Sequence, residues 1–182
     1  QGGTAATQDV FIEHVGQPTL ACIRPAVKAL QDLNMHRKVQ LIISGGIRTG
    51  ADVAKALALG ADAVSIGTAA LIALGDNDPI WEKEYEKLGT KAGCYDDWHE
   101  GTDPAGITTQ DPILAARLDP VIGGERIKNY LKVMVLELQT LARACGKNDV
   151  RNLEPEDLCA LTLEAAAMAG VPLAGTDWIP GK

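Results

Sequence analysis

The chain has 182 residues, of which 46% are hydrophobic and 23% are charged, and its formal net charge is −7. No apolar run is long enough to span a bilayer, and an acidic balance with dispersed lysines and arginines argues against a nucleic-acid surface. We therefore expect a cytoplasmic, globular protein with neither membrane nor nucleic-acid partners. The four cysteines show no CxxC spacing, and we expect reduced, buried thiols at Cys22, Cys94, Cys145 and Cys159.

A helix is expected near the start of the chain, after residues 1–16, which we expect to form a loop with a short helical or extended element. Pro18 suits the first turn of a helix, and the apolar residues after it keep helical spacing as far as Asn34. Pro25 should kink or interrupt this helix, because proline lacks the backbone N–H and crowds the preceding turn. The apolar residues that follow this helical spacing are Ile23, Val27, Leu30 and Leu33.

Two short strands, each followed by glycine, are the most informative part of the sequence. Residues 41–44 run into the pair Gly45–Gly46, and residues 63–66 run into the pair Gly67–Thr68. Between them, residues 49–59 have the apolar spacing of an amphipathic helix. A strand, a helix and a second strand in this order predict two adjacent parallel strands.

These glycine turns predict a phosphate-binding site, because glycine lets backbone N–H groups come close to an anion. A dinucleotide-binding unit would need G-x-G-x-x-G and an acidic residue after the second strand, and the sequence has neither. Two successive glycine-ended strands match instead the loops after strands seven and eight of a (β/α)8 barrel, which bind phosphate at its C-terminal face. The guanidinium of Arg48 could add a further contact. The candidate ligand-binding residues are Gly45, Gly46, Arg48, Gly67 and Thr68.

The rest of the chain is expected to be helical with one irregular segment. A helix is predicted over Ala69–Leu74, followed by a polar stretch from Asp76 to Gln110 that contains one short helix at Ile80–Leu88. Two clear helices follow, at Arg126–Cys145 and at Pro155–Ala169. They form a helical tail.

The predicted fold class is α/β, as the C-terminal part of a TIM barrel: its last two strands and helices six to eight, followed by the helical tail. A complete barrel needs about 200 to 250 residues, yet the first glycine-ended strand begins at Leu41 of a 182-residue chain. We therefore expect the other strands upstream or in another chain. The expected division is 1–75 for the barrel part, 76–119 for the irregular segment and 120–182 for the tail.

Several segments together resemble the FMN-binding synthase domain of the glutamate synthase family: VFIEHVGQPT, the strand pair IISGGIRTG and ADAVSIGTAALIALG, and PAGITTQDP. In that family, a flavin-bearing barrel adds ammonia to 2-oxoglutarate, and a separate amidotransferase unit delivers the ammonia from glutamine. The resemblance implies amidotransferase-like and accessory subunits as partners, and FMN phosphate bound at the glycine turns. It also implies a loop over the flavin and the keto acid at Gly2, Gly3 and Thr4. The catalytic groups would lie outside this sequence, so none is assigned.

The sequence departs from that family at the iron–sulfur cluster. Typical members hold a 3Fe–4S cluster with three cysteines, the last two in a CHxxxCP-like stretch just before GxxTQ. Here Trp98 and Asp103 stand at those two positions, and Cys94 is the only thiol nearby. One thiolate cannot hold such a cluster. We expect FMN without the cluster, and acidic side chains around His99 that are solvated and bind no metal.

Other functions stay open. N-methylglutamate synthase contains a glutamate-synthase-like subunit, and its exchange of methylamine for the amino group of glutamate needs no net redox change. Type 2 isopentenyl-diphosphate isomerases, 2-hydroxy-acid oxidases and inosine-monophosphate dehydrogenases have similar glycine turns. A hydroxy-acid oxidase would want a histidine near the seventh strand, but no histidine lies between His36 and His99. A flavin-free scaffold subunit is the last alternative, and flavin absorbance would distinguish it.

Overall fold

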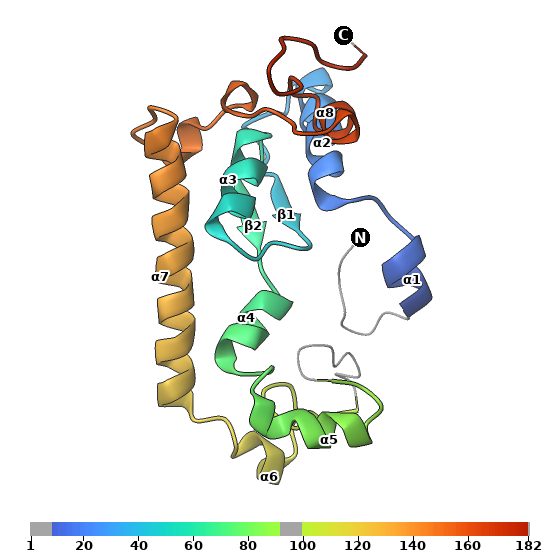
Figure 1. The fold of residues 1–182 in the computed structure, drawn as a ribbon, viewed down its shortest axis with the longest axis vertical. Coiled ribbons are helices and arrows are strands. Elements are labelled where there is room, and N and C mark those ends of the chain that lie inside the picture. Colours follow the sequence, from blue (N-terminus) through green and yellow to red (C-terminus); the bar gives the residue numbers. More distant parts are fainter. Residues whose placement is uncertain (1–8, 92–99, 182) are drawn as a thin grey trace. The chain divides into compact units, whose positions relative to one another are not determined.

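The computed structural model describes residues 9–91 and 100–181. These residues form two compact units, which we describe separately. The first contains residues 16–65 and the chain from Val133 onward, and the second contains residues 66–132 and the stretch that ends at Val15. Figure 1 labels the helices and strands of both units.

A parallel βαβ motif forms the centre of the first unit (Figure 1). Strands β1 (Ile42–Ser44) and β2 (Ala63–Ser65) pair in parallel, with Ser44 opposite Ser65 at their ends. Helix α3 (Gly50–Ala58) connects the two strands. The predicted pair of adjacent parallel strands is confirmed, and the chain is of the α/β class.

The core of the first unit packs two further helices with this motif, α2 (Thr19–Asp32) and α8 (Leu163–Ala169). The interruption expected at Pro25 is not seen, since α2 runs through that residue. Side chains on both sides of the proline are buried, and their packing offsets the missing backbone hydrogen bond. The buried cluster is Ile23, Val27, Ile43, Ala56, Leu59, Ala61, Ala160, Ala166 and Val171.

The prediction of one continuous helix over residues 155–169 is wrong. The segment contains a short 3-10 helix, η3 (Pro155–Asp157), then extended chain, and only then α8. Ala160 forms a parallel bridge with Leu173: its N–H donates to the carbonyl of Pro172, and its carbonyl accepts from Ala174 N, both at 2.8 Å. This pairing uses backbone groups that a helix would need for itself.

The second unit is mainly helical. It contains α1 (Asp9–His14), α4 (Thr68–Leu74), the 3-10 helix η1 (Pro79–Trp81), α5 (Glu82–Lys87) and α6 (Pro112–Ala115). Within the irregular segment, η1 and α5 confirm the short helix expected from residue 80. Helix α4 likewise confirms the helix expected from residue 69.

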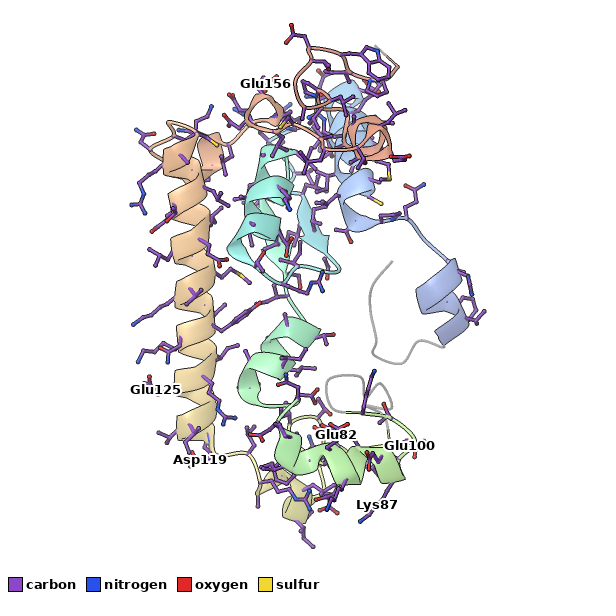
Figure 2. The ribbon with its side chains drawn as sticks, viewed as in Figure 1. Glu82, Lys87, Glu100, Asp119, Glu125 and Glu156 are labelled. Atoms are coloured by element: carbon purple, nitrogen blue, oxygen red, sulfur yellow. The ribbon has the colours of Figure 1, made fainter. Side chains whose placement is uncertain are left out.

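Helix α7 (Pro120–Ala144) contributes residues to both units and begins before the predicted start at Arg126. Asp119, labelled in Figure 2, explains the earlier start. Its carboxylate oxygen Oδ1 accepts from Val121 N at 2.8 Å and from Ile122 N at 3.2 Å. An aspartate in this place satisfies N–H groups that the first turn leaves without partners, and proline is well tolerated directly after it. After α7, a further 3-10 helix, η2, spans Val150–Asn152.

The cysteines differ from the expectation of buried thiols. Cys22 is partly exposed, while Cys145 and Cys159 are exposed; Cys94 lies outside the described residues. Cys145 follows the end of α7, where the chain turns at Gly146, and Cys159 lies in the extended stretch before α8. In the part of the chain that the structure describes, no helix is long and apolar enough to cross a membrane.

Candidate functional site

The turn after β1 has the backbone shape that the sequence predicts. Gly45 has φ 114° and Gly46 has φ 70°, in a region that residues with a side chain rarely adopt. A Cβ atom at Gly46 would meet no other atom within 4 Å. Packing therefore does not explain the glycine at this position, and the space beside the backbone is open.

The segment after β2 also has open space beside its backbone. Gly67 lies two residues beyond Ser65 and precedes α4, and a Cβ atom there would also meet nothing within 4 Å. Because Ser44 and Ser65 are register partners, both strands leave the sheet at the same edge. Gly45, Gly46 and Arg48 belong to the first unit, whereas Gly67 and Thr68 belong to the second. The expected substrate loop at Gly2, Gly3 and Thr4 lies outside the described residues.

A capping box fixes the chain between Gly46 and α3. The hydroxyl of Thr49 accepts from Asp52 N, and Asp52 Oδ2 accepts from Thr49 N at 3.0 Å and from Arg48 N at 3.1 Å. Partial burial opposes ionisation of Asp52, but these hydrogen bonds hold its pKa below the ordinary value. The side chain of Arg48 is exposed. Asp52 therefore orders the backbone at Arg48.

A pocket of about 430 Å³ opens beside the Gly45–Gly46 turn. Its other walls are the first turn of α2, from Pro18 to Ala21, and three residues of α8: Ala165, Met168 and Ala169. The hydroxyl of Thr19 donates to the carbonyl of Ser44 at 3.3 Å, which ties α2 to the end of β1. Sequence reasoning missed the contribution of α8, because nothing local links residues 165–169 to the turn.

A second polar cluster in the described chain is buried in the other unit. Asp76 is 1% exposed and Asp103 is 0% exposed, and both contact the hydroxyl of the buried Tyr85. Tyr85 Oη lies 2.9 Å from Asp103 Oδ1 and 3.1 Å from Asp76 Oδ1. The expectation that Asp103 is solvated is wrong. These contacts link residues far apart in sequence, so local pattern gives no sign of them.

Asp103 organises the loop around it. Its Oδ1 accepts from Ala105 N at 3.0 Å, and its Oδ2 accepts from Ile107 N at 2.8 Å and from Thr108 N at 2.9 Å. The hydroxyl of Thr108 adds a further bond at 3.1 Å. A buried carboxylate is stable only when its oxygens are satisfied in this way. In contrast, the acidic side chain of the neighbouring Glu100, labelled in Figure 2, is exposed.

Arg117 supports the same loop from outside. Its guanidinium donates to the carbonyl of Pro104 at 2.8 Å and to Glu84 Oε2 at 2.9 Å, and it lies 5.0 Å from the ring centre of Trp81. Asp103 and Arg117, both of the second unit, therefore hold the loop through hydrogen bonds to its backbone.

We expect Tyr85 to stay protonated at alkaline pH. Burial, followed by the carboxylates of Asp103 and Asp76, raises the pKa of Tyr85 above its ordinary value. The protonated phenol therefore stabilises the fold fully below about pH 10, the ordinary tyrosine pKa, and this contribution is lost as pH rises through the higher folded pKa. At about pH 11, the phenolate absorbance of the native protein should equal that of a Tyr85→Phe variant. One additional equivalent of phenolate in the native protein would contradict this prediction.

The described residues hold no group of three or more histidine, cysteine, aspartate or glutamate side chains suited to a metal ion. Trp98, His99 and Cys94, on which the argument about the cluster depends, lie outside those residues. His14 is exposed on α1.

Comparison with known proteins gives a consistent result. A family model described as a conserved region in glutamate synthase matches residues 1–80 and 87–148. A glutamate synthase large subunit-like protein of Rhizobium meliloti (strain 1021) is 81% identical over 182 residues, which are 100% of this chain and 41% of that protein. An archaeal glutamate synthase (NADPH) of Methanocaldococcus jannaschii is 40% identical over 153 residues, 84% of this chain and 27% of that protein. A ferredoxin-dependent glutamate synthase of Cyanidium caldarium is 31% identical over 160 residues, 83% of this chain and 9% of that protein. The chain thus spans less than half the length of these relatives.

Proposed function

This chain belongs to the glutamate synthase family, and we propose that it forms part of an FMN-dependent enzyme that transfers an amino group to 2-oxoglutarate and so makes glutamate. The observation that carries this proposal is the pairing of Ser44 with Ser65, since each strand end is followed within two residues by glycine. Backbone N–H groups near one sheet edge suit a phosphate.

In this proposal, backbone N–H groups of Gly45, Gly46, Gly67 and Thr68 bind the phosphate of FMN, and Arg48 adds a cationic contact. The support is that a Cβ at Gly46 or Gly67 would enter open space, so these glycines leave room for a ligand. When bound, FMN would supply the electron transfer that reductive amination needs. The chain's own residues bind and orient it. The loop at Gly2, Gly3 and Thr4 would cover the flavin and the keto acid.

We further propose that β1 and β2 are the last two strands of a (β/α)8 barrel, with α2, α3 and α4 as its sixth to eighth helices. The remaining strands would come from the rest of the protein or from a partner chain. The division at residues 75 and 119, the amidotransferase-like and accessory partners, and a cytoplasmic location stay parts of this proposal.

Replacing Gly67 with valine tests the phosphate site. We expect FMN binding to weaken by about ten-fold or more, because the new side chain would occupy the space beside the backbone N–H groups. The measurement is flavin retention by the protein at its full natural length, after gel filtration, with the melting temperature as a check on folding. A folded variant with unchanged flavin content would overturn the site.

One observation favours a second candidate function, exchange of methylamine for the amino group of glutamate. Asp103, at a position where the resembling family has a cluster cysteine, is buried and accepts hydrogen bonds from its own loop. This geometry supports a loop that is organised without iron. An enzyme without a cluster suits an exchange that leaves no net change in electrons.

The electron balance separates the two reactions. Glutamate and methylamine give N-methylglutamate and ammonia without any reductant, whereas glutamine-derived ammonia and 2-oxoglutarate give glutamate only with a reductant such as reduced pyridine nucleotide or ferredoxin. We expect the intact complex to make glutamate with matching oxidation of the reductant, and to contain flavin but no stoichiometric iron or acid-labile sulfide. Product from glutamate and methylamine alone would favour the exchange reaction instead.

A further inference from the structure

Leu161 is the most exposed large apolar side chain that the structure describes, at 85%. Its neighbours in the chain are both held in place. Ala160 is buried and pairs with Leu173, while the hydroxyl of Thr162 caps α8 by accepting from Ala165 N at 3.2 Å. The exposure of Leu161 therefore belongs to an ordered part of the backbone.

Helix α8 continues this apolar surface. Leu163 is 50% exposed, and Ala167, one turn later on the same side of the helix, is exposed as well. The opposite side of α8 is buried in the core of the first unit through Ala166. Neighbouring exposed apolar side chains with polar groups around them are typical of surfaces that bind another protein. We call Leu161, Leu163, Glu164 and Ala167 the outer face of α8.

The outer face of α8 lies beyond the part of the chain that the family model matches. That match ends at residue 148, whereas the Rhizobium relative is similar over all 182 residues. A role of this face in binding would therefore be particular to this chain and to relatives that share the later segment.

The charged groups of this later segment are all negative. Residues 152–181 contain five acidic side chains and no lysine, arginine or histidine. Two of the five, Glu154 and Asp157, pair with Lys147 at 3.1 and 3.4 Å. Those that are exposed and form no ion pair within the described part of the chain are Glu156, labelled in Figure 2, Glu164 and Asp177. A surface that complements this segment must therefore be apolar and positively charged.

We propose that the outer face of α8 binds an accessory protein subunit, through a segment in which lysine or arginine side chains flank apolar ones. The apolar side chains of that segment would cover Leu161 and Leu163, and its cations would pair with Glu164 and its acidic neighbours. A symmetric contact between two copies of this chain would instead bring acidic groups together, because residues 152–181 supply no cation. This inference rests on the accessory partners of the proposed function but not on its flavin site.

Photo-crosslinking from position 161 tests the choice of partner. The protein at its full natural length is purified at low salt together with the subunits that accompany it, with p-benzoylphenylalanine in place of Leu161. Illumination should join this residue to a different polypeptide, at a segment of the stated chemistry. The same probe in place of Glu86, which is exposed on α5, should not reach that segment. A link to a second copy, a link to another part of the same polypeptide, or no link at all would overturn the proposal.

Two substitutions on the outer face separate charge from apolar contact. Glu164→Lys should weaken the association with the linked subunit by about ten-fold at low salt and by less at high salt, because salt screens exposed charges. Leu161→Ser should weaken it by about ten-fold at both salt concentrations. Glu86→Lys makes the same change of charge in the other unit, so it should leave the affinity unchanged. The melting temperature of each variant checks its folding.

Flavin content and glutamate formation of the same variants keep this inference apart from the proposed function. Folded Glu164→Lys and Leu161→Ser variants with the native affinity for the subunit would overturn the role of the outer face, and would leave the proposed function standing if flavin is retained. A native complex that shows the link at position 161 but binds no flavin would overturn the proposed FMN-dependent reaction and leave this surface in place.

Discussion

Replacing Gly50 with alanine should lower the free energy of unfolding by about 3 kcal/mol. Gly50 is the first residue of α3, and it lies against the backbone of α7. A Cβ atom there would clash with the carbonyl oxygen of Met134 and would come within 2.8 Å of Leu138 N and 2.6 Å of Glu137 Cβ. Because two of these three atoms belong to the backbone, no change of rotamer relieves the contact. The two helices must move apart.

The same movement would break a hydrogen bond that joins the helices. Gly50 N donates to Glu137 Oε2 at 2.8 Å, so a side chain of α7 satisfies one of the N–H groups left without a partner at the start of α3. The loss should appear as a lower midpoint in urea unfolding followed by far-ultraviolet circular dichroism. A variant with the stability of the native protein would show that α3 and α7 do not approach so closely.

Gly124→Ala is the control for this prediction. Gly124 lies within α7, and a Cβ atom there would meet no atom within 4 Å. Alanine is the better helix former, so this substitution should raise the free energy of unfolding by about 0.5 to 1 kcal/mol. The same change from glycine to alanine should therefore lower the free energy of unfolding at Gly50 and raise it at Gly124.

The βαβ motif could be predicted from the sequence because its signals are local. Strand-forming residues end at Gly45, and the helical spacing and the Thr49–Asp52 capping box lie within a few residues of one another. The glycine turn could be predicted for the same reason, since a positive φ at Gly46 is a demand of the backbone itself. Local residue spacing and the backbone conformation of the turn are therefore enough to predict these parts of the candidate site.

The remaining parts of the site depend on contacts between distant residues. The bridge between Ala160 and Leu173 divides the expected C-terminal helix. The secondary-structure propensities of residues 155–162 do not predict this bridge. The burial of Asp103 likewise follows from Tyr85, 18 positions earlier. An aspartate in a glycine-containing loop is usually exposed, and only the tertiary structure shows that its carboxylate forms the centre of the loop.

Asp103→Asn should lower the free energy of unfolding by about 2 to 3 kcal/mol, although it changes the size of the side chain very little. An amide has only one acceptor oxygen. If its NH₂ group takes the place of Oδ2, the N–H groups of Ile107 and Thr108 lose their acceptor. If it takes the place of Oδ1, Tyr85 could accept from it, but Ala105 N could not. In either orientation at least one backbone N–H loses its partner, and Ala105 is itself buried.

Asp111→Asn separates this effect from a general loss of negative charge in the same loop. Asp111 is exposed and caps α6, and its single oxygen Oδ1 accepts from Ile113 N at 2.8 Å and from Leu114 N at 3.0 Å. Asparagine supplies that one oxygen and is an equally good N-cap, so stability should change by no more than about 0.5 kcal/mol. Urea unfolding of both variants gives the comparison. Equal losses would mean that charge alone matters, whereas a loss confined to Asp103→Asn requires a carboxylate with both oxygens engaged.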